Sequence, residues 1–164
     1  MTGIHACIIS RTFNAPRALV WRAWSDLANL AKWFGPPGTT TPMAKMRFRT
    51  GETSHYSMAG PDGREMWGKL AYRELVPLEK IAWVNSFSDR HGAMSRHPLS
   101  ATWPLQMLTE VTFAERDGRT TVAIKWLPLG GTDEECETFE SAQASMTDRW
   151  AGAFERLAKF VIEN

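Results

Sequence analysis

The end of the chain, from Thr132 onward, carries the pattern of one long amphipathic helix, which constrains the fold more than any other feature. Thr132 and Glu135 have the spacing of a capping box, in which each side chain binds the other residue's backbone N–H. Apolar residues then recur at helical spacing: Phe139, Ala142, Met146, Trp150, Ala153, Leu157 and Phe160 or Val161. This pattern predicts a helix over 132–162 with one buried face.

The acidic residues at this helix start do not indicate a metal site. Glu134, Glu135 and Glu137 complement the positive end of the helix dipole, which explains their position. The histidines have no ligand spacing to a second His, Cys or carboxylate: His5, His55, His91 and His97. We therefore predict no metal and no cofactor.

The segment 42–129 reads as strands and turns. Strands are predicted over 4–13, 43–49, 52–58, 65–76, 81–87, 105–115 and 120–127. Gly60-Pro61-Asp62-Gly63 and Arg116-Asp117-Gly118-Arg119 have the composition of hairpin turns, because Pro fixes φ and Gly accepts a positive φ. Consecutive hairpins predict an antiparallel sheet.

Two short helices are predicted between the first strand and the rest of the sheet. Pro16 favours a helix start, and apolar residues at helical spacing follow: Val20, Trp24, Leu27, Ala31 and Phe34. Asp26 could cap the second helix, and Gly35-Pro36-Pro37-Gly38 ends it, since no helix continues through that sequence.

This order of elements predicts an α+β fold and a single domain over 1–164. An antiparallel sheet of six to seven strands should curve around the long C-terminal helix, because strands twist. A helix on a curved sheet does not fill the space evenly, so the remaining space is either filled by side chains or available to a ligand.

Several stretches of the sequence resemble the START-like helix-grip (SRPBCC) superfamily, and more narrowly a bacterial part of the branch named after the activator of the heat-shock protein 90 ATPase. They are Phe13-Asn14-Ala15-Pro16, Trp33-Phe34-Gly35-Pro36, Tyr56-Ser57-Met58-Ala59-Gly60, Tyr72-Arg73-Glu74-Leu75-Val76-Pro77 and Trp150-Ala151-Gly152-Ala153-Phe154. The resemblance implies the helix-grip fold and, often, a hydrophobic ligand between helix and sheet. It implies no single shared reaction.

Two departures from this pattern affect the expected function. The eukaryotic co-chaperone has a further N-terminal domain that contributes to partner binding, and 164 residues leave no room for one. Ser54 stands where many relatives carry an aromatic residue, which should leave more open volume beside Tyr56.

Strand alternation and the helix stripe predict which side chains line the space between helix and sheet. The candidate ligand-binding residues are Trp33, Tyr56, Met58, Trp83, Asn85, Phe87, Met107, Trp126, Trp150 and Phe154. Asn85 is the most informative of them, because a buried amide needs a hydrogen-bonding partner. That partner is Tyr56, a backbone group near the following loop, or a ligand.

The stretch 88–104 lacks periodicity and is long for a turn, so it is either a lid or a loose hairpin extension. Within it, His97 beside Arg96 could contact an anionic group of a ligand or could be an ordinary exposed histidine.

The charge pattern excludes two classes of partner. The 19 basic and 18 acidic residues are interleaved and give a formal net charge of +1, so neither nucleic acid nor a membrane surface is predicted as a partner. Cys7 and Cys136 have no partner motif and the N-terminus does not resemble a signal peptide, so we predict a cytoplasmic protein.

Three functions follow, in order of preference. The first is binding of a small hydrophobic or aromatic molecule, without catalysis. The second is a cyclase or dehydratase in which Tyr56, Asn85 and Glu74 move protons. The third is a co-chaperone or stress-response interaction. The sequence leaves a homodimer open.

Overall fold

The structure is a computed structural model, and it describes residues 6–26, 29, 33, 43–45, 48–59, 65–97 and 100–163. The strands are β1 (Cys7–Phe13), β2 (Met43–Lys45), β3 (Thr53–Ala59), β4 (Glu65–Val76), β5 (Lys80–Ser88), β6 (Met94–Ser95), β7 (Met107–Arg116) and β8 (Arg119–Pro128). The helices are α1 (Arg17–Ser25), α3 (Asp133–Ser141) and α4 (Gln143–Glu163). The α+β fold predicted from the sequence is confirmed.

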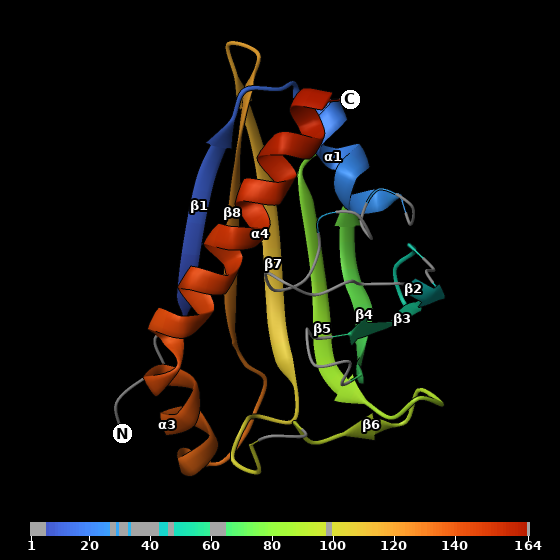
Figure 1. The fold of residues 1–164 in the computed structure, drawn as a ribbon, viewed down its shortest axis with the longest axis vertical. Coiled ribbons are helices and arrows are strands. Elements are labelled where there is room, and N and C mark those ends of the chain that lie inside the picture. Colours follow the sequence, from blue (N-terminus) through green and yellow to red (C-terminus); the bar gives the residue numbers. More distant parts are fainter. Residues whose placement is uncertain are drawn as a thin grey trace.

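All pairings in the sheet are antiparallel, in the order β1-β8-β7-β5-β4-β3-β2, with β6 attached to β5. The sheet curves, and α4 crosses it in front of β1, β8 and β7 (Figure 1). The β7–β8 hairpin turns at Asp117 and Gly118, which both have positive φ, as a tight two-residue hairpin requires. The β3–β4 pairing likewise confirms the second predicted hairpin, whose turn lies outside the described residues.

The first helix begins where the sequence predicts. Pro16 is the N-cap of α1 in an extended conformation, and its carbonyl accepts hydrogen bonds from the N–H groups of Leu19 and Val20. Val20, Ala23 and Trp24 are buried. The predicted second short helix and its Gly-Pro stop fall almost entirely outside the described residues, where only positions 29 and 33 are placed.

The single helix predicted over 132–162 is wrong in one respect, since it is two helices that meet at Ala142. The capping box at its start is confirmed: Glu135 N donates to Thr132 Oγ1 at 3.1 Å, and Thr132 N donates to Glu135 Oε1 at 2.9 Å. Ala142 has φ −92° and ψ −2°, outside ideal helix geometry. α3 packs against β8, whereas α4 packs mainly against β1 and α1, so one straight helix could not make both contacts with a curved sheet.

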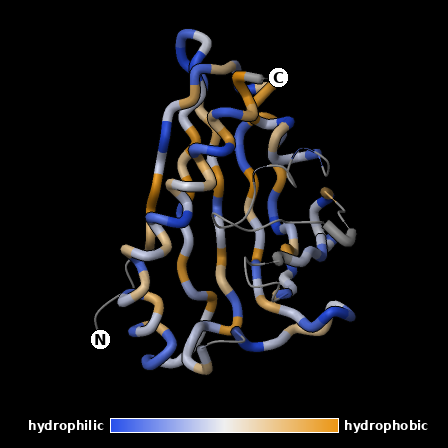
Figure 2. Tube along the Cα trace, viewed as in Figure 1, coloured by the Kyte–Doolittle hydropathy of each residue, from blue (hydrophilic) through white to orange (hydrophobic). Residues whose placement is uncertain are grey.

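The core lies between the helices and the concave face of the sheet. Along β7 and β8, buried residues alternate with more exposed ones, and hydrophobic and hydrophilic residues are interspersed along the strands (Figure 2). The largest fully buried side chains are Trp24, Trp33, Phe13, Phe139 and Phe154.

Within the described ranges, no helix combines the length and apolar character that a membrane span requires.

Gly68, in the middle of β4, makes room for the ring of Tyr56 on β3. The two residues are direct partners in the sheet. A Cβ atom on residue 68 would lie 2.6 Å from both Cζ and Oη of Tyr56, closer than real Cβ contacts. Glycine is therefore required here because an aromatic side chain crosses its backbone.

We expect Gly68→Ala to destabilise the fold by about 1–3 kcal/mol, because the added methyl group overpacks a buried site. Chemical denaturation would measure the loss. In a double-mutant cycle, the same change in a Tyr56→Ala background should cost much less, since the ring is then absent. Equal costs in both backgrounds would contradict the assigned contact.

Candidate functional site

Five of the ten candidate residues meet in one aromatic cluster between α1, α4 and the sheet. Trp24 is at its centre. Its ring centroid is 4.6 Å from that of Trp33, 6.0 Å from that of Trp83 and 6.2 Å from that of Trp150, on which it stacks at 14°. Trp150 also contacts two more rings at 5.9 Å, those of Trp126 and Phe154.

This cluster fills the space under α4 with side chains. Trp33, Trp83, Trp126 and Phe154 are at most 5% exposed, so they belong to the core. Trp150 is the half-buried member.

Trp24 was predicted as part of a helix stripe but not as a candidate site residue. Its indole Nε1 is the one fully buried side-chain N or O atom, among the described residues, that has no hydrogen-bond partner.

A second group of candidates lies beside this cluster on β3, β5 and β7. Tyr56 and Phe87 flank Gly68 on either side, and Asn85 pairs with Met107. Met107 and Tyr56 are buried, whereas Asn85 and Phe87 are half-buried. The backbone of Met58 belongs to β3, and its side chain lies outside the description. The packing is therefore less closed here than in the aromatic cluster.

The partner of Asn85 is neither Tyr56 nor a loop backbone group, so both of these hypotheses are wrong. Thr109 Oγ1 donates to Asn85 Oδ1 at 2.7 Å. Thr109 is the sheet partner of Trp83, two residues before Asn85, so the bond runs diagonally between β7 and β5. Only the register of β5 and β7 brings Thr109 to Asn85. The Asn85 Nδ2 group makes no hydrogen bond within the part of the chain that the structure describes.

The small side chain of Ser54 is fully buried and is used in the protein's own hydrogen bonding. Its hydroxyl donates to the Tyr72 hydroxyl at 3.0 Å. The open volume predicted beside Tyr56 stays a prediction. Burial, and to a smaller extent the neighbouring Tyr72, raises the pKa of Tyr56 to about 12. Burial also raises the pKa of Tyr72, although the hydrogen bond from Ser54 acts in the opposite direction.

The chain has two tyrosines, and in the folded protein we expect the pKa of each to lie above 10, the usual value, with that of Tyr56 near 12. The folded state favours the neutral phenol of Tyr56, so this phenol contributes its full share to the free energy of unfolding below about pH 10. That share, on the order of 2–3 kcal/mol, is lost as the pH rises toward about 12. Phenolate absorbance and denaturation against pH would measure both effects.

A Tyr56→Phe variant should lose less stability over the same pH range. Two phenols that ionise near pH 10 while the circular dichroism spectrum is unchanged would contradict the assigned burial.

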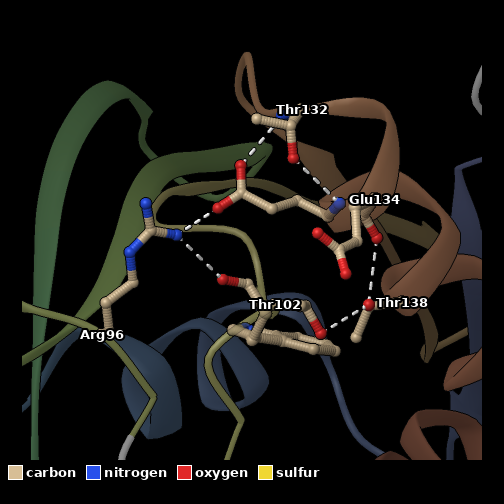
Figure 3. A network of polar contacts seen from close by, with 7 residues as sticks. Arg96, Thr102, Thr132, Glu134 and Thr138 are labelled. Atoms are coloured by element: carbon tan, nitrogen blue, oxygen red, sulfur yellow. Dashed lines mark hydrogen bonds and ion pairs between the residues drawn. The ribbon is translucent and has the colours of Figure 1, made fainter.

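The loop that follows β5 contacts α3 through side chains in its described part. β6 pairs with the end of β5. Arg96 forms an ion pair with Glu135, and its Nη1 also donates to the Trp103 carbonyl at 3.4 Å. The hydroxyls of Thr102 and Thr138 are 2.9 Å apart (Figure 3). A role as a lid stays a prediction.

His97 is half-buried in this loop rather than exposed. Its ring centroid is 4.5 Å from that of Phe87 and 6.2 Å from that of Trp103. Burial lowers the pKa of His97, and the positive charge of Arg149 on α4 lowers it further. His97 therefore lies beside the half-buried candidates, while its neighbour Arg96 turns to Glu135.

Two other groups do not form a catalytic site. Glu74 is half-exposed, and one of its carboxylate oxygens is 2.7 Å from Lys80 Nζ. His55 Nε2 lies 3.1 Å from Ser88 Oγ, but the serine hydroxyl donates to the Asp89 carbonyl, so histidine does not activate it. No group of His, Cys, Asp and Glu side chains among the described residues could hold a metal ion.

We expect Arg96→Gln to loosen the loop, because the ion pair with Glu135 is lost while the capping box remains. Trypsin cleavage after the exposed Arg90 should accelerate several-fold under native conditions, since proteolysis follows local opening. Arg116→Gln, at the exposed tip of the β7–β8 hairpin, is the matched control and should leave the rate unchanged. An unchanged rate in Arg96→Gln would show that the ion pair does not hold the loop.

Comparisons with known proteins agree with the fold. A family model described as Activator of Hsp90 ATPase homolog 1-like protein matches residues 14–161. No curated protein matches the chain at a significant level.

Solved structures of bacterial proteins have the same fold. Protein Ms6760 from Mycobacterium smegmatis is 21% identical with a TM-score of 0.74, over 93% of this chain and 87% of that one. A protein from Arthrobacter aurescens is 23% identical with a TM-score of 0.79, over 100% and 91%. Protein CV1439 from Chromobacterium violaceum is 24% identical with a TM-score of 0.70, over 95% and 96%.

Proposed function

The chain belongs to the family of Activator of Hsp90 ATPase homolog 1-like proteins, and from this premise we propose that it binds a small hydrophobic or aromatic molecule between α4 and the concave face of the sheet, without catalysis. This fold commonly has a ligand-binding cavity. The proposed binding surface is formed by Phe87, Asn85 and Met107 on the sheet and by Trp150 on α4. Tyr56 adds the side toward β3.

The observation that carries the proposal is the half-buried amide of Asn85. Its oxygen accepts from Thr109, whereas its Nδ2 group has no acceptor in the described part of the chain. Its partners in the sheet are Leu70 and Met107, which offer no side-chain oxygen. An amide in such surroundings needs water or a ligand group to complete its hydrogen bonds. A half-buried apolar surface around one polar group is the usual composition of a small-molecule site.

The proton-transfer candidates argue for binding rather than catalysis. A phenol with a pKa of about 12, as in Tyr56, releases a proton too reluctantly to act as an acid near neutral pH. Glu74 is engaged by Lys80 at the far end of its strand. Asn85 can donate and accept hydrogen bonds but does not titrate. These residues can orient a bound molecule better than they can transform it.

We expect the protein to bind decan-1-ol or 2-naphthylmethanol, one neutral alkyl probe and one neutral aromatic probe. Isothermal titration calorimetry should give a saturable signal for at least one, and the melting temperature should rise with probe concentration, because the probe binds only the folded state. Phe87→Ala should weaken that binding about tenfold, since a large part of the apolar contact is lost.

Ile8→Ala is the matched control. Ile8 is 65% exposed on the edge strand β1, so its removal should leave probe affinity unchanged. If neither probe gives a saturable signal or a shift in melting temperature, the proposal is wrong. It is also wrong if both variants change the affinity equally.

From the sequence we further propose a cytoplasmic location, with neither nucleic acid nor a membrane surface as a partner.

A further inference from the structure

Trp24, at the centre of the aromatic cluster, has a buried hydrogen-bond donor that its surroundings leave unmatched. Its side chain is 2% exposed, and no acceptor in the described part of the chain binds its indole Nε1. Two other indoles of the cluster do have partners. Trp33 Nε1 donates to the Ala23 carbonyl at 2.9 Å, and Trp126 Nε1 donates to Met146 Sδ at 3.2 Å. A buried N–H without a partner is rare in native proteins, because it gives up its hydrogen bond to water and gains none in return.

The rings around Trp24 offer no oxygen acceptor. The ring centroids of Trp33, Trp83 and Phe113 lie 4.6, 6.0 and 5.9 Å from that of Trp24. The ring of Trp150 stacks on it at 6.2 Å. An indole nitrogen donates but does not accept, a phenyl ring has no polar atom, and an aromatic face is only a weak acceptor. The cluster itself therefore does not supply the acceptor that the Trp24 N–H group needs.

Trp150 separates Trp24 from the proposed binding surface. The other three rings around Trp24, those of Trp33, Trp83 and Phe113, are at most 4% exposed, whereas Trp150 is half-buried. Trp150 is also the residue that α4 contributes to the proposed binding surface. A molecule on that surface thus contacts the least buried ring that packs against Trp24.

A second unmatched donor lies on the same surface. Asn85 Oδ1 accepts from Thr109, whereas Asn85 Nδ2 has no acceptor in the described part of the chain. Asn85 is two positions after Trp83, whose ring contacts that of Trp24, so both side chains lie on one face of β5. Both unmatched groups are uncharged donors. Their complement is an uncharged oxygen that accepts without bringing a donor of its own, which describes a carbonyl group.

We propose that the bound molecule carries a carbonyl oxygen that accepts a hydrogen bond from Trp24 Nε1, while its apolar body packs against Met107 and Trp150. This inference rests on the proposed function and specifies its ligand class, an uncharged apolar ketone or related carbonyl compound. The ring of Trp150 moves away from Trp24 as the carbonyl group enters. A second carbonyl oxygen, where the molecule has one, binds Asn85 Nδ2.

Matched probes test this class. 2-Acetonaphthone is compared with 2-isopropenylnaphthalene, and decan-2-one with 2-methyldec-1-ene, by equilibrium dialysis. In each pair a methylene group replaces the carbonyl oxygen, so the shape is kept and the acceptor is lost. Trp24→Phe removes the indole N–H group. For at least one pair, we expect this variant to weaken binding of the ketone about tenfold more than binding of the hydrocarbon.

Trp126→Phe is the matched control. It makes the same change of ring size in the same cluster, but at an indole whose N–H group already donates to Met146 Sδ. It should change the affinities for both members of a pair by the same factor.

Nuclear magnetic resonance of the isotope-labelled wild-type protein tests the same contact without a substitution. The indole N–H signal of Trp24, assigned through bonds, should move downfield when the ketone saturates the protein and much less with the hydrocarbon. The physical reason is that a hydrogen bond to oxygen deshields the donated proton.

The outcomes separate this inference from the proposed function. Equal weakening of both members of each pair in Trp24→Phe overturns the carbonyl inference and leaves the proposed function intact. A Trp24 N–H signal that does not move with the ketone does the same, as does a loss of the ketone preference in Trp126→Phe as large as in Trp24→Phe. Absence of binding by all four probes overturns the inference. If decan-1-ol and 2-naphthylmethanol also fail to bind, the proposed function is wrong as well.

Discussion

The stacking of Trp150 on Trp24 joins α4 to α1. Trp24 also contacts Trp83, and Trp150 contacts Trp126, and these two contacts join the helices to the sheet. Aromatic side chains of this size bury much apolar surface and prefer defined relative orientations, so the cluster sets the rotation of α4 about its axis. That rotation directs Glu155 toward Arg11 on β1 and Arg156 toward the Trp33 carbonyl. The positions of these two charged side chains are thus a consequence of core packing.

Glu135 connects a second pair of elements. One of its carboxylate oxygens accepts from the Thr132 backbone N–H and completes the capping box, and the other pairs with Arg96. The hydrogen bond from the Thr132 backbone and the hydrogen bond and charge of Arg96 lower the pKa of the Glu135 carboxyl. Glu135 therefore joins the loop that follows β5 to the start of α3 (Figure 3).

Between these two regions, side-chain burial decreases over a few residues of β5. Trp83 is 4% exposed and lies two positions before Asn85, which is half-buried. The proposed binding surface lies where this burial decreases, next to the densely packed core. The burial that fits the ring of Tyr56 over Gly68 also raises the pKa of its phenol.

What the sequence by itself determined follows from short-range periodicity. The capping box of Thr132 and Glu135, the start of α1 after Pro16, and the hairpin at Asp117 each depend on residues a few positions apart. Only the tertiary structure decided the break at Ala142, the bond from Thr109 to Asn85 and the ion pair of Arg96 with Glu135. The first depends on the curvature of the whole sheet, and the other two join residues 24 and 39 positions apart. Such contacts arise from strand register and helix docking, which no local pattern of residues specifies.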